Sequence, residues 1–347
     1  MTHSNISIFV PHMGCPHTCS FCNQRTISST ERPPSPDDVR KIIGTQFERI
    51  SDISRRKETE IAFFGGSFTA IDEEYRRQLL EAAFPFTEKA RADGFRGIRI
   101  STRPDCISDE ILDELDRYGV TSIELGAQSM SDRVLQMNER GHTADDVRRS
   151  SEMIRSRGFE LGLQMMVGLY GSTREDEYRT MTEIIKISPD TVRIYPVSVL
   201  RGTKLAELYE SGEYKLYSFD ECVNICAMIY WAFRSVDIRV IRMGLHAEDS
   251  VGGSAVAGFY HPAFAEIVRS KIVREIIEKY YESECRIGDA LEVSANKSLI
   301  GAVYGHKKSN RLYFSKVGMN VKISEDNSLA PDTLSINKEV RNVFKIT

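Results

Sequence analysis

Short apolar runs alternate with longer amphipathic stretches along the first two thirds of the chain. The apolar runs lie at Asn5–Val10, Glu60–Phe64, Ile98–Ser101, Ser122–Leu125, Leu161–Val167, Val192–Val197 and Arg239–Met243. Helix start signals stand between them, with Ser35 before Pro36, Ser108, and Thr143 before Asp145. This alternation predicts parallel βαβ units that form a partial or full barrel, with any chemistry at the carboxyl ends of the strands.

The pattern changes after about Asp249. Residues 252–264 (GGSAVAGFYHPAF) read as a glycine-rich connection, and Ala265–Tyr281 reads as one amphipathic helix. Four short segments then favour antiparallel strands: LEVSA, LIGAVYG, RLYFSKV and NVKIS. The sequence therefore predicts two domains, a barrel core over 1–248 and a small α+β accessory unit over 249–347.

Composition narrows the class of protein. The chain has 347 residues, 41% of them hydrophobic, and a formal net charge of -4, so a large core is expected and a generally basic, nucleic-acid-coating protein is not. No apolar run is long enough to span a bilayer, and the first residues lack the features of a signal peptide. We therefore expect a cytoplasmic protein whose cysteines are reduced, so that clustered ones indicate metal or redox work.

Three cysteines follow the first predicted strand. Cys15, Cys19 and Cys22 have the spacing C-x3-C-x2-C. Three thiolates on one loop can ligate three irons of a [4Fe-4S] cluster and leave the fourth iron open, with Phe21 limiting solvent access. The same spacing also suits a structural zinc ion with His12 or His17 as a further ligand. The position of the loop at the end of a first strand favours the iron–sulfur cluster.

The motif and several later stretches resemble the radical S-adenosylmethionine (SAM) superfamily. The closer likeness is to the branch that holds the Elongator catalytic subunit and oxygen-independent coproporphyrinogen III oxidase. The stretches are FFGGSFT (63–69), STRPD (101–105), ELGAQS (124–129), NERGHT (138–143) and IYPVSVLRGTKL (194–205). The resemblance implies a partial (β/α)6-type barrel. It also implies a [4Fe-4S] cluster that cleaves SAM to a 5'-deoxyadenosyl radical, which abstracts hydrogen from a substrate.

The resemblance also implies a SAM pocket. Its expected residues are Gly65, Gly66, Ser101, Gln128, Arg140 and Gln164. The glycines would let the methionyl amino group approach the backbone, and Arg140 would pair with the SAM carboxylate. Ser101, Gln128 and Gln164 would lie near the SAM ribose. Some of these residues also have a plainer interpretation: a tight turn for the glycines, a solvated helix-end arginine for Arg140, and a satisfied core amide for Gln164.

Other side chains are weaker candidates. Four side chains would line the barrel, where they would either face the substrate or fill the interior: Arg193, Tyr195, Arg242 and His246. Cys106, Cys222, Cys226 and Cys285 read as structural thiols, and the middle two share the apolar face of one predicted helix.

The substrate class stays open between an RNA base and a small molecule or cofactor precursor. Lys297–Lys322 contains six basic and no acidic residues, which suits RNA or a solvated β-hairpin turn. The chain is too short after the barrel for the acetyltransferase domain of the Elongator subunit, and its cysteine spacing is shorter than in that subunit. The expected partner is a flavodoxin- or ferredoxin-like electron donor, with no membrane. A zinc-stabilised RNA-binding protein without catalysis is the alternative of another class.

Overall fold

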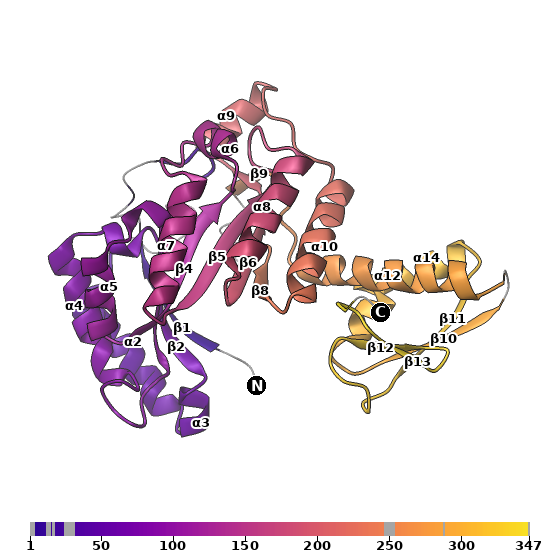
Figure 1. Ribbon diagram of the computed structural model, residues 1–347, viewed down its shortest axis with the longest axis horizontal. Coiled ribbons are helices and arrows are strands. Elements are labelled where there is room, and N and C mark those ends of the chain that lie inside the picture. Colours follow the sequence, from indigo (N-terminus) through magenta and orange to yellow (C-terminus); the bar gives the residue numbers. More distant parts are fainter. Residues whose placement is uncertain are drawn as a thin grey trace.

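The computed structural model describes residues 4–11, 15, 18–23, 32–245, 254–286 and 289–345. Its largest feature is a seven-stranded sheet in the order β1-β2-β3-β4-β5-β6-β8 (Figure 1), and every neighbouring pair is parallel. The strands are β1 (Ser4–Val10), β2 (Thr59–Gly65), β3 (Gly97–Thr102), β4 (Val120–Gln128), β5 (Glu160–Val167), β6 (Thr191–Pro196) and β8 (Arg239–Met243). The predicted partial barrel is confirmed, because β1 and β8 stay as edges and the described sheet curls without closing.

Helices connect the strands, and α2, α5 and α7 begin at the positions that the sequence predicts. They are α2 (Pro36–Arg49), α3 (Ile53–Arg56), α4 (Glu73–Ala83), α5 (Asp109–Arg117), α6 (Asp132–Met137), α7 (Ala144–Ser156), α8 (Arg174–Ile187), α9 (Lys204–Glu210) and α10 (Phe219–Ser235). Ser35 and Thr143 each form a capping box with the acidic residue three positions later, and Ser108 caps α5. The local hydrogen bonds of these polar side chains therefore set the helix starts.

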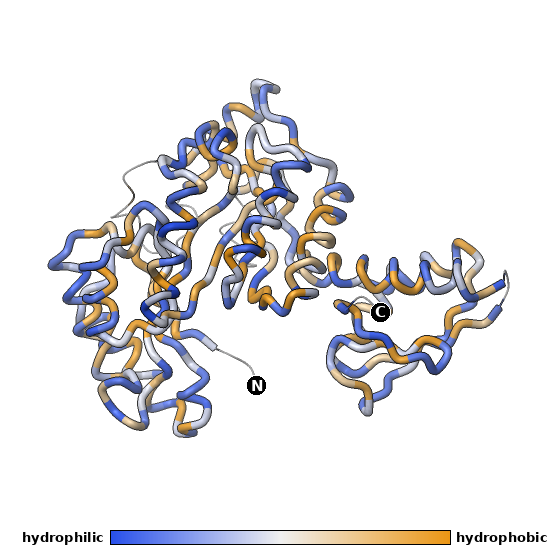
Figure 2. Tube along the Cα trace, in the orientation of Figure 1, coloured by the Kyte–Doolittle hydropathy of each residue, from blue (hydrophilic) through white to orange (hydrophobic). Residues whose placement is uncertain are grey.

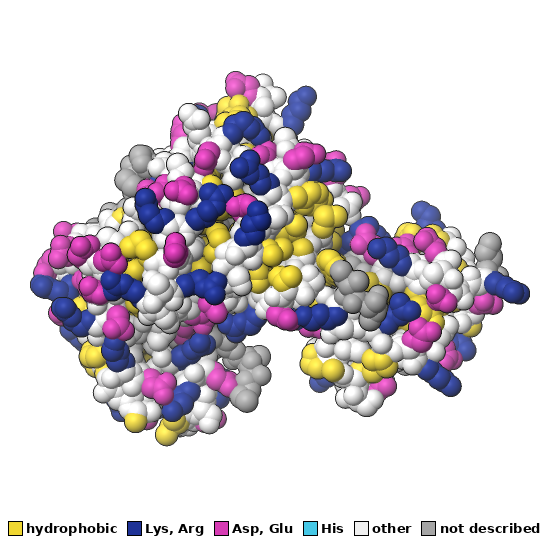
Figure 3. Space-filling view, in the orientation of Figure 1, with side chains coloured by type: hydrophobic (Ala, Val, Ile, Leu, Met, Phe, Trp, Pro, Cys, Tyr) yellow, Lys and Arg dark blue, Asp and Glu magenta, His cyan; other side chains and the backbone are white. Residues whose placement is uncertain are grey.

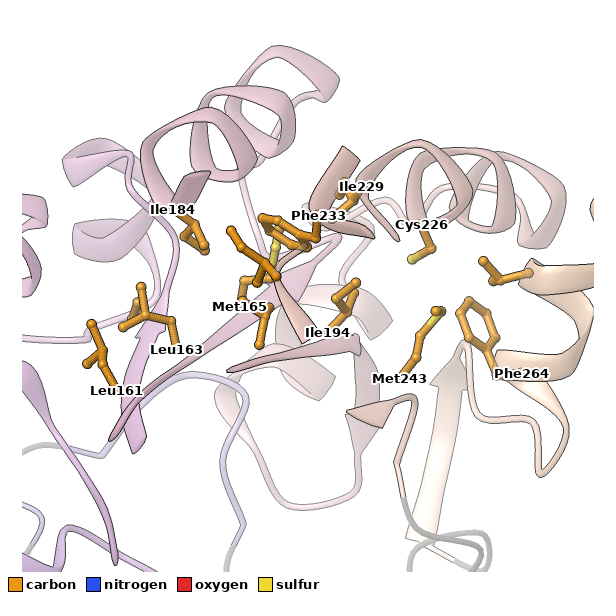
Figure 4. Close-up of a cluster of buried hydrophobic side chains, with 14 of the residues drawn as sticks. Leu161, Leu163, Met165, Ile184, Ile194, Cys226, Ile229, Phe233, Met243 and Phe264 are labelled. Carbon is orange, nitrogen blue, oxygen red and sulfur yellow. The ribbon is translucent and has the colours of Figure 1, made fainter. Parts of the chain in front are cut away.

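The core lies between the outer face of the sheet and the helices. Leu161, Leu163 and Met165 alternate along β5 and point toward Ile184 of α8 and Phe233 of α10 (Figure 4). Apolar positions gather on the strands and along α10 (Figure 2). Since side chains alternate along a strand, the polar residues between these positions face the inside of the barrel.

A small second sheet covers the carboxyl-end side of the barrel. It pairs β7 (Ser198–Leu200) with β9 (Ala255–Gly258) in antiparallel register. Sequence patterns predicted only a glycine-rich connection there. Gly258 has a φ of +110°, and a Cβ on it would lie 2.6 Å from the Val197 carbonyl oxygen, so the close approach requires glycine. The predicted domain boundary at 248/249 falls just before β9, outside the described residues, and stays a prediction.

The last part of the chain forms the predicted small α+β unit (Figure 1). It consists of α12 (Phe264–Glu284), β10 (Ala290–Ala295), α13 (Ile300–Tyr304), α14 (Ser309–Lys316), β11 (Asn320–Glu325), β12 (Thr333–Ile336) and β13 (Glu339–Asn342). The sheet order is β11-β10-β12-β13, in which β10 and β11 are parallel and the other pairs antiparallel. The prediction of antiparallel strands is therefore wrong for the pairing of LEVSA in β10 with NVKIS in β11, whereas β10 does pair antiparallel with β12.

Two of the strands predicted in this unit are also wrong. LIGAVYG forms α13 and RLYFSKV lies in α14, while the predicted hairpin turn HKKSNR covers a 3-10 helix at His306–Lys308 and the start of α14. Their β-branched and aromatic residues favour strands locally, but packing outweighs that preference. Asn310 is buried and donates from its amide nitrogen to the Ser270 and Ala302 carbonyls at 2.8 and 3.0 Å, which ties α14 to α12 and α13.

The accessory unit is anchored to the barrel through α10. Trp231 Nε1 donates to the Val343 carbonyl at 3.1 Å, and Arg234 pairs with Asp332 at 2.8 Å. Both contacts join the outer side of α10 to the segments that follow α12. Within the described part of the chain, no helix has the length and apolar character needed to cross a membrane.

Candidate active site

The cysteine loop follows β1 and is gripped by two later segments. The Ser20 amide donates to the Asn138 carbonyl at 3.1 Å, and Ser20 Oγ donates to Asn138 Oδ1 at 2.9 Å. The Leu205 amide donates to the Ser20 carbonyl at 2.7 Å. Asn138 is itself fixed, because its Nδ2 donates to the Val134 and Tyr170 carbonyls. Ser20, which follows Cys19 directly, is therefore held through its amide, its carbonyl and its hydroxyl.

Phe21 packs into a second apolar cluster at the mouth of the barrel. This cluster is built from Val134, Leu169, Val197, Val199, Leu205, Ala206 and Tyr214. Its members come from α6, α9, β7 and the segments that follow β5 and β6. Burial of the aromatic ring thus anchors the cysteine loop over the carboxyl ends of the strands.

Arg140 reaches this loop from the segment between α6 and α7. Its Nη1 donates to Cys19 Sγ at 3.1 Å, and its Nη2 donates to the Gly126 carbonyl at 2.7 Å. Six arginines are buried in the described chain: Arg56, Arg76, Arg99, Arg103, Arg140 and Arg193. Five of them pair with a carboxylate, and Arg140 is the exception among the described residues. A buried cation without a carboxylate is costly unless another anion faces it.

The donor set of the loop fits an anionic metal cluster. Thiolate ligands carry negative charge, and the uncompensated Arg140 cation lies against Cys19 Sγ. Burial raises the pKa of the Cys15 thiol, while the Ser67 amide and the charges of Arg103 and Arg140 oppose that rise. Among the described residues no three Cys, His, Asp or Glu side chains already converge as a metal site. His12 and His17, which the zinc alternative needs, lie outside those residues.

The two glycines after β2 meet the backbone of β1. Gly65 has a φ of +124°, and a Cβ on it would lie 2.2 Å from the Val10 carbonyl oxygen. The Gly66 amide donates to that same oxygen at 3.2 Å. The turn therefore requires glycine at position 65 for steric reasons, and contact of Gly65 and Gly66 with SAM stays a prediction.

Three predicted pocket residues carry a buried polar atom that has no partner among the described residues, and Arg140 Nε is one of these atoms. The hydroxyl of Ser101 on β3 and Oε1 of Gln128 at the end of β4 make no hydrogen bond in the described structure. Gln128 also has a left-handed φ of 63°, next to a register irregularity between β4 and β5. Strain and unmet hydrogen-bonding capacity at strand ends are typical of positions that bind a ligand.

Gln164, by contrast, belongs to a buried ionic network that sequence patterns did not predict. Its Nε2 donates to Glu124 Oε2 at 2.9 Å. Arg193 holds both Glu124 oxygens at 2.7 and 2.8 Å, and Arg99 joins Glu60, Glu124 and Glu160. The plainer interpretation of Gln164, a satisfied core amide, thus accounts for its nitrogen, and its contact with the SAM ribose stays a prediction. The sequence signal that could have revealed this network is the presence of charged residues at alternate positions of the predicted strands.

Of the weaker candidates from the sequence, Arg193 lies in this network and Tyr195 lies beside it. Arg193 is occupied by Glu124, and Tyr195 stands beside it, with a pKa raised chiefly by burial. Arg242 Nε donates to the Gly244 carbonyl at 3.1 Å, and His246 lies outside the described residues. Cys106 is half-buried with a pKa raised by burial, while Cys222 and Cys226 are buried in α10. Figure 4 shows Cys226 within the hydrophobic core, as predicted.

An open cavity of about 720 Å³ adjoins the cysteine loop at Thr18. Asp132, Gln136, Glu139 and His142 contribute to its wall. His142 Nε2 lies 3.2 Å from the Ala127 carbonyl, and burial together with Arg140 and Arg103 lowers the pKa of this imidazole to about 4. The loop therefore has one side against the barrel and another beside an open surface.

The curled parallel sheet carries a loop with three cysteines at the carboxyl ends of its strands, which is the arrangement that the resemblance predicted. Comparison with known proteins gives the family. Residues 9–184 match the radical SAM superfamily and residues 189–274 match the radical SAM C-terminal domain. The first match spans more than half of the chain, so this protein belongs to the radical SAM superfamily, and the predicted resemblance is confirmed.

Relatives point to the expected branch. The tRNA uridine(34) acetyltransferase of Methanocaldococcus jannaschii is 28% identical over 197 residues, which are 52% of this chain and 36% of that protein. Human Elongator complex protein 3 is 34% identical over 188 residues, 49% of this chain and 34% of that protein. The solved archaeal Elp3 of Methanocaldococcus infernus aligns with a TM-score of 0.59 at 21% identity, covering 83% of this chain and 67% of that one. This chain thus spans about a third of the two curated relatives.

Proposed function

We propose that this chain is a radical SAM enzyme in which Cys15, Cys19 and Cys22 hold a [4Fe-4S] cluster. When bound, the cluster supplies the electron that cleaves SAM and so yields a radical able to abstract hydrogen. Membership of the superfamily supports the reaction class. The observation that carries the proposal is the buried Arg140 cation, which faces Cys19 Sγ at 3.1 Å and pairs with no carboxylate in the described part of the chain.

The residues around the loop have separable tasks in this proposal. Asn138 and Leu205 fix the loop through Ser20, and Phe21 seals its apolar side. Ser101 and Gln128 offer buried, unpartnered oxygens at strand ends, where the hydroxyls of the SAM ribose would donate or accept. The turn at Gly65 and Gly66 lies at the end of β2, and its backbone would meet the methionyl amino group of SAM. Together these residues would hold SAM over the barrel mouth.

The test is anaerobic reconstitution with iron and sulfide, followed by dithionite, SAM and chromatography for 5'-deoxyadenosine. The proposal expects 5'-deoxyadenosine from the wild type and none from Cys19→Ala. Cys222→Ala is the matched control, since this thiol is buried in α10 far along the chain from the loop. A zinc-loaded, colourless wild type with no SAM cleavage would favour the non-catalytic RNA-binding alternative.

For the substrate, we propose an RNA base. The names of the M. jannaschii and human relatives support it, although their whole-protein activities do not transfer to a chain that spans a third of them. A second support is the surface of the accessory unit, where Lys307, Lys308, Arg311 and Lys316 are exposed and form no ion pair with any described carboxylate. Figure 3 shows basic side chains around this unit, interspersed with acidic ones.

A labelling experiment tests the substrate class. Deuterated total RNA, or deuterated small molecules from the same cells, are incubated with the reconstituted enzyme and SAM. Hydrogen abstraction from RNA would transfer deuterium into 5'-deoxyadenosine only in the first reaction. Transfer only from the small-molecule fraction would overturn the RNA proposal and leave SAM cleavage standing.

A further inference from the structure

Arg140 contacts a cysteine sulfur, whereas the family resemblance predicts contact with the SAM carboxylate. We propose that Arg140 is a positioning residue for the iron–sulfur cluster, which holds the Cys19 sulfur and makes the bound cluster easier to reduce. This inference rests on the proposed function. In this proposal, the primary role of the NERGHT stretch (138–143) is to hold the cysteine loop, and contact with SAM is secondary.

Hydrogen bonds fix both the guanidinium and the backbone of Arg140. Nη2 donates to the Gly126 carbonyl at 2.7 Å, which leaves Nη1 directed at Cys19 Sγ at 3.1 Å. At the backbone, the Arg140 amide donates to the Leu135 carbonyl at 3.0 Å, and Arg103 Nη2 donates to the Arg140 carbonyl at 2.5 Å. Arg103 is in turn held by Asp105 through two hydrogen bonds. Such a chain leaves the side chain little freedom to turn away from the sulfur.

The residues beside Arg140 grip the same loop. Asn138 binds both the amide and the hydroxyl of Ser20, and Glu139 adopts a left-handed φ of 55° between the two gripping residues. Glu139 also pairs with Lys204 on α9, whose neighbour Leu205 donates to the Ser20 carbonyl. One short turn thus holds the loop by the Ser20 backbone on one side and by the Cys19 sulfur on the other.

Charge decides what this contact does. A hydrogen bond from a cation to a thiolate ligand stabilises negative charge on the cluster, and a reduced cluster carries one more negative charge than an oxidised one. The effect is stronger in a buried site, and Arg140 is only 7% exposed. Because no described carboxylate neutralises Arg140, its full charge acts on the cluster. We therefore expect Arg140 to raise the reduction potential of the cluster.

The experiment compares reconstituted wild type, Arg140→Lys and Arg140→Gln. The cluster is titrated with dithionite and mediator dyes in the absence of SAM and followed by electron paramagnetic resonance, and SAM affinity is measured separately. At a fixed potential, Arg140→Gln should lower the ratio of reduced to oxidised cluster at least tenfold, which is about 59 mV for one electron. Arg140→Lys keeps the charge without the fork and should fall between the two.

Arg133→Gln is the matched control. Arg133 lies on the neighbouring α6, is half exposed and pairs with Asp176, so its loss should leave the potential unchanged. Equal potentials in wild type and Arg140→Gln, with weaker SAM binding in the variant, would overturn the inference in favour of the carboxylate role. If Arg140→Gln takes up no iron, the reduction potential of Arg140→Lys is compared with that of wild type. A lower potential in Arg140→Lys supports the inference, and an equal one overturns it. A wild type that takes up no cluster would instead contradict the proposed function.

Discussion

The interior of the barrel and its mouth are both rich in buried polar groups, but they differ in how those groups are satisfied. Inside, Arg99 and Arg193 are surrounded by Glu60, Glu124 and Glu160, and every one of these charges has a partner of opposite sign. At the mouth, Ser101 Oγ and Gln128 Oε1 have no partner among the described residues, and no described carboxylate pairs with Arg140. The difference separates groups that complete the fold from groups that await a ligand.

The physical reason is the cost of burial. A buried polar atom without a hydrogen bond loses its interaction with water and gains nothing, which costs on the order of 1–3 kcal/mol. Such atoms persist where a bound molecule repays that cost. The ionic network needs nothing from outside, so it closes the interior and leaves the mouth as the place for SAM.

The largest effect is expected at the cysteines. Replacing Cys15, Cys19 or Cys22 singly by Ala removes one of the three thiolate ligands, so 5'-deoxyadenosine production and cluster iron should both fall to background. The protein should stay folded by circular dichroism, because the loop contributes little to the core. Retained SAM cleavage in any of the three variants would break the assignment of the mouth as the cluster site.

The next effect is expected inside the barrel. Arg99→Met would leave Glu60 and Glu124 buried with one partner fewer, which should cost about 3–5 kcal/mol of unfolding free energy. Urea denaturation followed by circular dichroism measures this cost. An exposed arginine, Arg77→Met on α4, provides the comparison and should cost little. Equal losses of unfolding free energy in the two variants would mean that the buried network stabilises the fold no more than an exposed ion pair does.

A buried carboxylate without a cation sharpens the comparison further. Glu177 on α8 accepts from the Gly168 amide at 2.7 Å and from Ser172 Oγ at 2.8 Å, and burial raises its pKa from 4.5 to about 7. Burial also opposes ionisation of Glu124, but Arg193 and Arg99 outweigh it and lower the pKa of that carboxyl. The pKa of Glu177 is therefore raised, whereas the pKa of Glu124 is lowered.

The sign of the pH dependence follows for Glu177. Because its folded-state pKa is raised, the folded protein keeps a proton that the unfolded chain loses between pH 4.5 and 7, and stability falls as pH rises through that window. The loss should total roughly 3 kcal/mol for wild type and be absent in Glu177→Gln, measured by urea denaturation at pH 5 and pH 8. Parallel stability profiles for the two proteins would contradict the assignment.

The smallest effect is expected at Ser101, where stability and binding should change in opposite directions. Ser101→Ala removes a buried hydroxyl that has no partner among the described residues, so the ligand-free protein should become more stable by about 1 kcal/mol. SAM affinity, measured by calorimetry on the reconstituted enzyme, should weaken about fivefold for the loss of one hydrogen bond. Loss of stability without loss of affinity would place Ser101 with the interior network.

The parts of this fold that were predictable depend on local signals. The helix starts at Ser35 and Thr143 follow from side chains that bond their own backbone, and the cysteine loop follows from its spacing. Of the accessory helices, α12 was predicted, but α13 and α14 were missed because packing of the buried Asn310 against α12 and α13 outweighs local strand preference. Which charges meet inside the barrel depends on strand register, so neither the Glu124–Arg193 pair nor the contact of Arg140 with Cys19 can be read from spacing.

The central claim is that an iron–sulfur cluster binds at the mouth beside Arg140. The most direct measurement is anomalous diffraction from crystals of the anaerobically reconstituted protein, with data collected on both sides of the iron edge and of the zinc edge. The predicted result is a cluster of iron peaks within bonding distance of Cys15, Cys19 and Cys22 and next to the Arg140 guanidinium. A single zinc peak on these cysteines, or iron bound elsewhere, would contradict the claim.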